Sequence, residues 1–167
     1  MKRAIIALLL GSWVVVGPAC HKGVLAMNGK KDGGDVDRRI EKLRDVITLP
    51  ATPTEVWFQQ APLGKPGGLG PTDYLLVAVM RFQPADLARI TSAAQARPGS
   101  PPRISTAANR PWLPEPVRAA IHPFDDRSVT IRGSEFDASL FAKSPFLSGT
   151  FVALEGGEWV LLVLQTS

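Results

Sequence analysis

The chain has 167 residues and a formal charge of +4, and apolar residues make up 45% of it. These values fit one globular domain, and they exclude a fully disordered chain and a protein with several membrane spans. Apart from the first 19 residues, 17 basic groups face 15 acidic groups, which is too even a balance for a protein that covers nucleic-acid phosphates. The lone Cys20 excludes an internal disulfide and a multi-cysteine metal site, and neither a metal nor a cofactor is expected.

The N-terminal segment has the layout of a secretory signal peptide. Lys2 and Arg3 precede an uncharged apolar run at residues 4–16, and the Gly-Pro pair that follows interrupts a helix. A helix over this run spans about 20 Å, which is short of the roughly 30 Å hydrocarbon core of a bilayer. We therefore expect residues 1–19 to be a cleaved signal peptide, with a transmembrane anchor as the less favoured alternative.

Residues 17–20, Gly-Pro-Ala-Cys, resemble the lipobox of bacterial lipoprotein precursors. In that family the cysteine thiol receives a diacylglyceryl group, and cleavage leaves the acylated cysteine as the first residue. Ala19 matches the small residue before the cysteine, whereas Gly17 replaces the usual Leu or Val and Pro18 is unusual in the middle. The resemblance implies that Cys20 carries fatty acids such as palmitate. Cleavage by the ordinary signal peptidase is the alternative.

Lipidation also fits the chemistry of an exported protein. A free thiol at Cys20 would enter an oxidising compartment as a reactive group, and acylation removes that group. Several acyl chains together provide the hydrophobic signals that stable anchoring needs. Under the sorting rule of the family, His21 implies delivery to the outer membrane, facing the periplasm. The lipid bilayer, reached through acylated Cys20, is thus the first expected partner.

The residues after the cysteine divide into a tether and a domain. Residues 20–34 are rich in Gly and Lys, which is typical of a linker. A single domain is expected over residues 35–167. It begins with an amphipathic helix over residues 35–47, with Asp35 as N-cap, because apolar residues recur at helical spacing. These residues are Val36, Ile40, Leu43 and Ile47.

The first half of the domain alternates strands with loops and one helix. Residues 55–59 read as a strand, and residues 61–72 hold too many Gly and Pro for a regular element. Residues 73–82 are almost uniformly apolar, which predicts a central strand covered on both faces. Pro84 favours the first turn of a helix over residues 84–96.

The second half contains shorter elements. Residues 97–110 are expected to be a long Pro-rich loop, and residues 114–121 a short helix. Residues 128–132 alternate as a strand with Val129 and Ile131 facing inwards. One or two helical turns are expected over residues 136–143.

The C-terminal residues predict a β-hairpin. Two apolar runs, residues 150–154 and 158–164, flank the turn sequence Glu-Gly-Gly. Strands this apolar need a sheet and a covering layer. We therefore expect an α+β fold in which an antiparallel-dominated sheet of four to five strands has two to three helices packed against it.

One short segment could carry catalysis. His122, the only histidine beyond the signal and tether segments, lies close in sequence to Asp125 and Asp126. A small lipid-anchored hydrolase using His122 with either carboxylate is therefore one alternative. However, Pro123 makes the segment a turn, and such turns commonly use their carboxylates for local hydrogen bonds, so we assign no catalytic residue.

Arginines concentrate in the middle of the chain, where eight Arg and four acidic residues lie between Arg81 and Arg132. Arg beside aromatic groups is common at protein interfaces, although solvated surface charge is the simpler explanation. The candidate partner-contact residues are Arg97, Arg103, Arg110 and Trp112. Trp112, like Trp57 and Trp159, is also expected to anchor the core.

These observations favour a membrane-anchored envelope lipoprotein with a non-catalytic periplasmic domain. The domain is expected to bind a protein partner, an envelope polymer or a small ligand, and an inhibitor or immunity-type protein is a concrete version. The alternatives are the hydrolase described above and a structural component of an envelope assembly.

Overall fold

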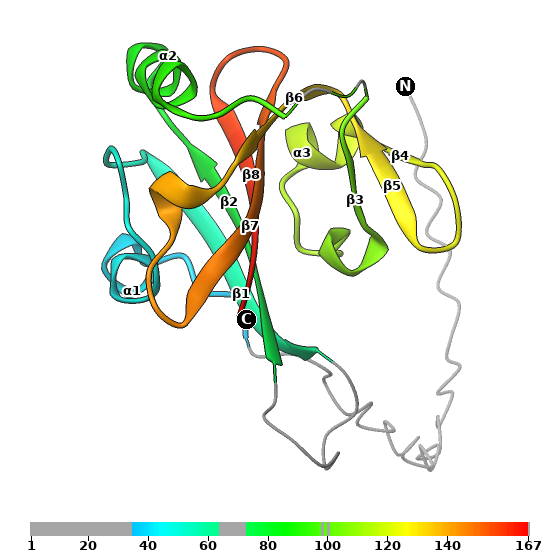
Figure 1. Ribbon diagram of the computed structural model, residues 1–167, viewed down its shortest axis with the longest axis horizontal. Helices are drawn as coiled ribbons and strands as arrows, with labels where there is room; N and C mark the ends of the chain where they lie inside the picture. The colour runs from blue at the N-terminus through cyan, green and yellow to red at the C-terminus, as the bar shows by residue number, and fades with distance from the viewer. Residues whose placement is uncertain (1–34, 64–72, 98, 100, 167) are drawn as a thin grey trace, which may run out of the picture. The chain divides into compact units, whose positions relative to one another are not determined.

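The computed structural model describes residues 35–63, 73–97, 99 and 101–166 (Figure 1). The signal segment, the lipobox-like residues and most of the loop expected at 61–72 lie outside the described residues. The helices are α1 (Ile40–Val46), α2 (Pro84–Ala93) and α3 (Glu115–Ala120), and the short 3₁₀ helices are η1 (Thr106–Ala108) and η2 (Ser139–Phe141). The strands are β1 (Glu55–Leu63), β2 (Asp73–Arg81), β3 (Arg103–Ser105), β4 (Ile121–Pro123), β5 (Ser128–Ile131), β6 (Gly133–Asp137), β7 (Phe146–Leu154) and β8 (Trp159–Thr166).

The strands form two sheets. Five of them pair in the order β1-β2-β8-β7-β6, and three shorter ones pair in the order β3-β5-β4. Every pair is antiparallel. The α+β fold with a C-terminal hairpin of β7 and β8 is therefore confirmed. The larger sheet stands between α1 and α2 on one side and the smaller sheet with α3 on the other (Figure 1).

Strand β2 explains why the larger sheet needs cover on both sides. It pairs with β1 along one edge and with β8 along the other, so it is a central strand as predicted. Its six residues from Leu75 to Met80 are all buried. Because side chains of a strand alternate between faces, this continuous apolar run supplies both layers of core.

The two layers have different composition. The helix-side core joins Leu43 of α1, Leu87 and Ile90 of α2 and Phe141 of η2 to one face of the larger sheet. Its five fully or nearly fully buried phenylalanines are Phe58, Phe82, Phe141, Phe146 and Phe151. The strand-side core lies on the opposite face and is aliphatic; its members are Leu75, Val77, Val79, Ile104, Ala108, Leu113, Val117, Ala120, Val129, Ile131, Val152, Leu154 and Leu161.

The first helix is shorter than predicted. Asp37 forms an isolated antiparallel bridge with Phe58 of β1, so the segment before α1 is extended and the helix begins at Ile40. The carboxylate of Asp37 accepts the backbone N–H of Arg39 at 2.9 Å. The N-cap of α1 is Arg39, so the prediction of Asp35 as N-cap is wrong, because pairing of Asp37 with β1 keeps the preceding residues extended.

Residues 136–143 agree only in part with the prediction of one or two helical turns. The 3₁₀ helix η2 provides one turn, whereas Phe136 and Asp137 belong to strand β6, which the sequence did not predict. Strand β6 pairs with β7 from Gly133↔Leu154 to Asp137↔Thr150. Strand β7 in turn begins at Phe146, four residues earlier than predicted. Pairing with β7 outweighs the weak local preference of this segment for helical turns.

The bounds of other elements also differ from the prediction because strands pair with one another. The loop predicted at 97–110 contains β3 and η1, and β3 exists because it pairs with β5. The helix predicted over 114–121 ends at Ala120, since Ile121 starts β4 on the other edge of β5. Strand β1 extends to Leu63 and includes Pro62. An edge strand tolerates proline because the missing N–H is not needed for pairing on both sides.

The hairpin turn between β7 and β8 requires glycine. Gly156 and Gly157 have φ angles of +103° and +75°, in the region that residues with a side chain rarely adopt. The Glu-Gly-Gly signal in the sequence therefore identified the turn correctly.

Candidate functional site

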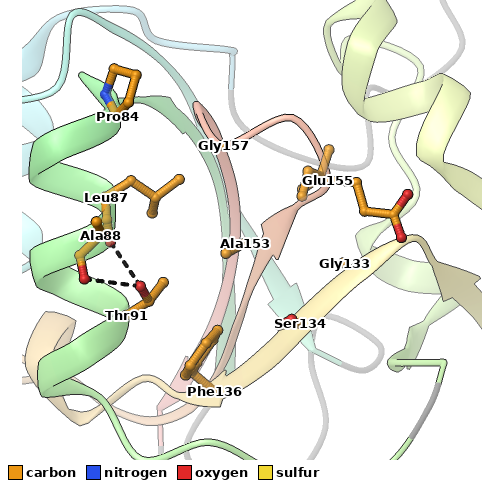
Figure 2. A pocket seen from close by; sticks show the side chains of 11 residues that line it. Pro84, Leu87, Ala88, Thr91, Gly133, Ser134, Phe136, Ala153, Glu155 and Gly157 are labelled. Atoms are coloured by element: carbon orange, nitrogen blue, oxygen red, sulfur yellow. Dashed lines mark hydrogen bonds between the residues drawn. The ribbon is translucent and has the colours of Figure 1, made fainter.

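A cleft lies between helix α2 and strands β6 and β7. It encloses about 350 Å³, which lies near the lower limit for ligand pockets. Leu87 and Ala88 of α2 face Phe136 and Ala153 of the sheet across this space (Figure 2). The helix-side core seals the bottom of the cleft because Leu87 is buried and Phe136 stacks on Phe151.

The polar groups around this cleft are few. The hydroxyl of Thr91 donates to the carbonyls of Leu87 and Ala88, both at 3.1 Å, so it is satisfied within its own helix (Figure 2). Ser134 and Glu155 contribute the remaining side-chain oxygens in the lining. The cleft therefore suits an apolar group with at most a few hydrogen-bonding atoms.

The sequence did not reveal this cleft. Its floor depends on β6, which was predicted to be partly helical, and its wall on α2, which is distant in the chain. The one local signal is the pair Leu87 and Ala88, where a small exposed residue follows a buried leucine on the helix.

His122 belongs to strand β4, whereas Asp125 and Asp126 lie in the turn between β4 and β5. All three residues are exposed. The carboxylate of Asp125 accepts the backbone N–H groups of Arg127 at 2.8 Å and Ser128 at 2.7 Å. These hydrogen bonds, that from Arg127 first, hold the pKa of Asp125 below its usual range. Asp125 thus closes the turn, as local side-chain bonding in the sequence suggested.

The four candidate partner-contact residues contact different parts of the fold. Arg97 forms an ion pair with Asp137 of β6 at 2.8 Å, which together with the N–H of Ser139 lowers the pKa of Asp137. Arg103 of β3 lies 3.7 Å above the ring of Phe124. Trp112 donates its indole N–H to Gln59 of β1 at 2.8 Å.

Arg110, the fourth candidate, is half-buried between η1 and α3. Its Nε is buried and has no hydrogen-bond partner among the described residues. Neither this placement nor those of the other three candidates tests a partner contact, so the partner role of all four stays a prediction.

The tryptophans form the rim of the strand-side core. Trp57, Trp112 and Trp159 are each partly buried and pack against that core. The rings of Trp57 and Trp159 are 5.7 Å apart, and Arg81 lies over Trp159. They pack against the core as expected but are not fully buried.

Arg81 links two hairpins at this rim. Arg81 forms ion pairs with Glu55 at 2.9 Å and with Glu158 at 2.7 Å. These carboxylates, Glu55 first, raise the pKa of the guanidinium. A second arginine, Arg38, lies over the ring of Trp57. Each of the three tryptophans of this rim thus already contacts a polar, charged or aromatic side chain of the same chain.

In the described ranges, no group of three or more His, Cys, Asp and Glu side chains is placed to hold a metal ion. None of the helices described is long and apolar enough to cross a membrane. A scan against protein-family models and searches of curated proteins and of solved structures found no match to this chain.

Proposed function

We propose that this chain is an envelope lipoprotein that is anchored through acylated Cys20 and binds a partner without catalysis. The observation that carries the proposal is the order of features at the N-terminus. Basic residues, an uncharged run, small residues and the only cysteine follow one another within twenty positions. The acyl chains insert into the outer membrane, and the domain faces the periplasm.

The α2–β7 cleft supports the binding part of the proposal. It is mostly apolar, and three of its lining residues, Leu87, Phe136 and Ala153, pack in the helix-side core. Its volume suits one large side chain of a partner or a small apolar ligand. Pre-formed apolar sites bind without ordering new structure, which reduces the entropic cost of association. We place the bound group between Leu87, Ala88 and Ala153.

Mass spectrometry of the mature protein from bacterial membranes tests the anchor. The expected N-terminal peptide starts at Cys20 and carries the added mass of a diacylglyceryl group. A Cys20→Ser variant is expected to lose the modification and to leave the membrane fraction. A mature protein that starts elsewhere, or that carries an unmodified Cys20, would contradict the proposal.

Two matched tryptophan variants test the cleft. Ala88→Trp fills it, whereas Ala93→Trp adds the same bulk at an exposed position on the last turn of the same helix. With N-phenylnaphthylamine as an apolar fluorescent probe, binding is expected for the wild type and Ala93→Trp and to be lost in Ala88→Trp. Equal binding by both variants would show that the probe does not use the cleft.

A further inference from the structure

Exposed apolar side chains gather at one end of the larger sheet. Leu63, Tyr74 and Leu147 are 37%, 43% and 56% exposed. Leu63 ends β1 and Tyr74 lies at the start of β2, one step along the same ladder. The N–H of Tyr74 donates to Thr166 at the end of β8, and Thr166 pairs with the residue before Leu147. The register therefore places all three at the same end, which we call the apolar end.

The described chain enters the fold at this same end. Asp37 pairs with Phe58 in the antiparallel sense, so residues before it run towards the Leu63 end of β1. Asp35 and Gln60 line one shared recess beside that strand. Figure 1 shows the start of the described chain near the lower ends of β1 and β2.

The sequence limits how far this end can lie from the proposed anchor. Fourteen residues separate Cys20 from Asp35, and fifteen extended residues span at most about 50 Å. The anchor therefore keeps Asp35, and the apolar end beside it, within about 50 Å of the bilayer. A tethered contact is intramolecular, so a weak apolar interaction is sufficient to keep it formed.

We propose that the apolar end rests in the headgroup region of the bilayer, with Leu63, Tyr74 and Leu147 in contact with lipid. This inference rests on the proposed anchoring through Cys20. Tyrosine suits the interface because its ring is apolar and its hydroxyl can stay hydrated. The carboxylate of Asp73 also lies at this end, within 3.4 Å of the Thr166 hydroxyl, so apolar contact and not attraction to anionic lipid drives the interaction.

A single-thiol labelling experiment on the full-length acylated protein tests this contact. Acylation blocks the sulfur of Cys20, so a second cysteine is the only group that reacts with an NBD thiol reagent. The label is placed by Tyr74→Cys or Leu147→Cys, and by Phe124→Cys as control. Phe124 is 50% exposed but belongs to the strand-side turn between β4 and β5. Each protein is reconstituted into phosphatidylethanolamine–phosphatidylglycerol vesicles with and without nitroxide-labelled lipid.

The expected result is a blue-shifted, brighter emission at positions 74 and 147 that nitroxide lipid quenches, and a water-like, unquenched emission at position 124. Equal emission at all three positions would overturn the contact while leaving the anchor intact. A blue-shifted label that the nitroxide lipid does not quench would overturn the lipid contact and would indicate that a second copy of the chain covers this end. Labelling of the wild-type protein would show that Cys20 is free, and the anchor and the contact would fail together.

Discussion

The two faces of the larger sheet are both buried, but they are buried in different ways. Against α1, α2 and η2 the core is rich in phenylalanine, and Phe151 contacts two further rings within about 5 Å. Against the smaller sheet and α3 the core is aliphatic, and tryptophans form its rim. Both layers contain many buried aliphatic side chains, and the helix side adds five buried phenylalanines, whereas the strand side adds a partly polar border. The difference teaches that single large side chains should matter more on the helix side than on the strand side.

Truncating one large buried side chain on each face of the larger sheet tests this difference most directly. Phe151→Ala is expected to lower the free energy of unfolding by about 3–5 kcal/mol, because a fully buried ring is lost together with its two aromatic contacts. Leu161→Ala removes a fully buried residue from the strand side and is expected to cost less, about 2–3 kcal/mol. Urea unfolding of both variants measures the difference, and a larger loss for Leu161→Ala would reverse the assignment.

The polar border of the strand side is expected to contribute less. Arg81→Met removes two ion pairs and a contact with Trp159. Arg81, Glu55 and Glu158 are each more than one-third exposed, so solvent screening keeps the expected loss of stability small, although it should exceed that of a single surface pair. Arg89→Met on α2 breaks one pair with Asp86 and serves as a helix-side control with an expected loss of about 0.3 kcal/mol. Unfolding at low and high salt should show that the difference shrinks as salt screens the pairs.

The pH dependence of unfolding tests the contributions of two carboxylates, Asp137 and Asp125, which have different partners. Asp137 and Asp125 both have lowered pKa values in the folded state, so each contributes stability that is present above about pH 4, the unfolded value, and lost as the pH falls through its folded pKa. Asp137→Asn and Asp125→Asn each remove a titrating carboxyl, so each variant should have a flatter pH dependence than the wild type. Asp137→Asn also loses the charged partner of Arg97, whereas the amide oxygen of Asp125→Asn can still accept the backbone N–H groups, so Asp137→Asn is expected to lose more stability at pH 7. Unfolding measured from pH 2 to 7 tests both points, and an unchanged pH dependence in either variant would contradict the first.

The smallest effect is expected at His122 of strand β4. His122→Ala should change the free energy of unfolding by no more than about 0.5 kcal/mol because the side chain is exposed. If the chain were a hydrolase that uses His122, the same variant would abolish its effect in the cell while folding stayed intact. An unchanged phenotype would dispose of that alternative.

The sequence predicted the elements that are apolar over a long run. Strands β2, β7 and β8, the hairpin turn and helix α2 were identified because burial on one or two faces leaves a pattern within the segment itself. The three-residue strands β3 and β4 carry no such pattern and form only because β5 pairs with both. The cleft and the apolar end could not be predicted, since they depend on which distant segments meet.

The distribution of ring types gives this protein an internal optical contrast. All three tryptophans of the described residues, Trp57, Trp112 and Trp159, belong to the strand-side rim, whereas the helix-side core contains phenylalanine alone among aromatic residues. Tryptophan emission during denaturation therefore reports on one layer, and far-ultraviolet circular dichroism at helical wavelengths is weighted towards the other. Coincidence of the two signals would mean that both layers melt as a single cooperative unit.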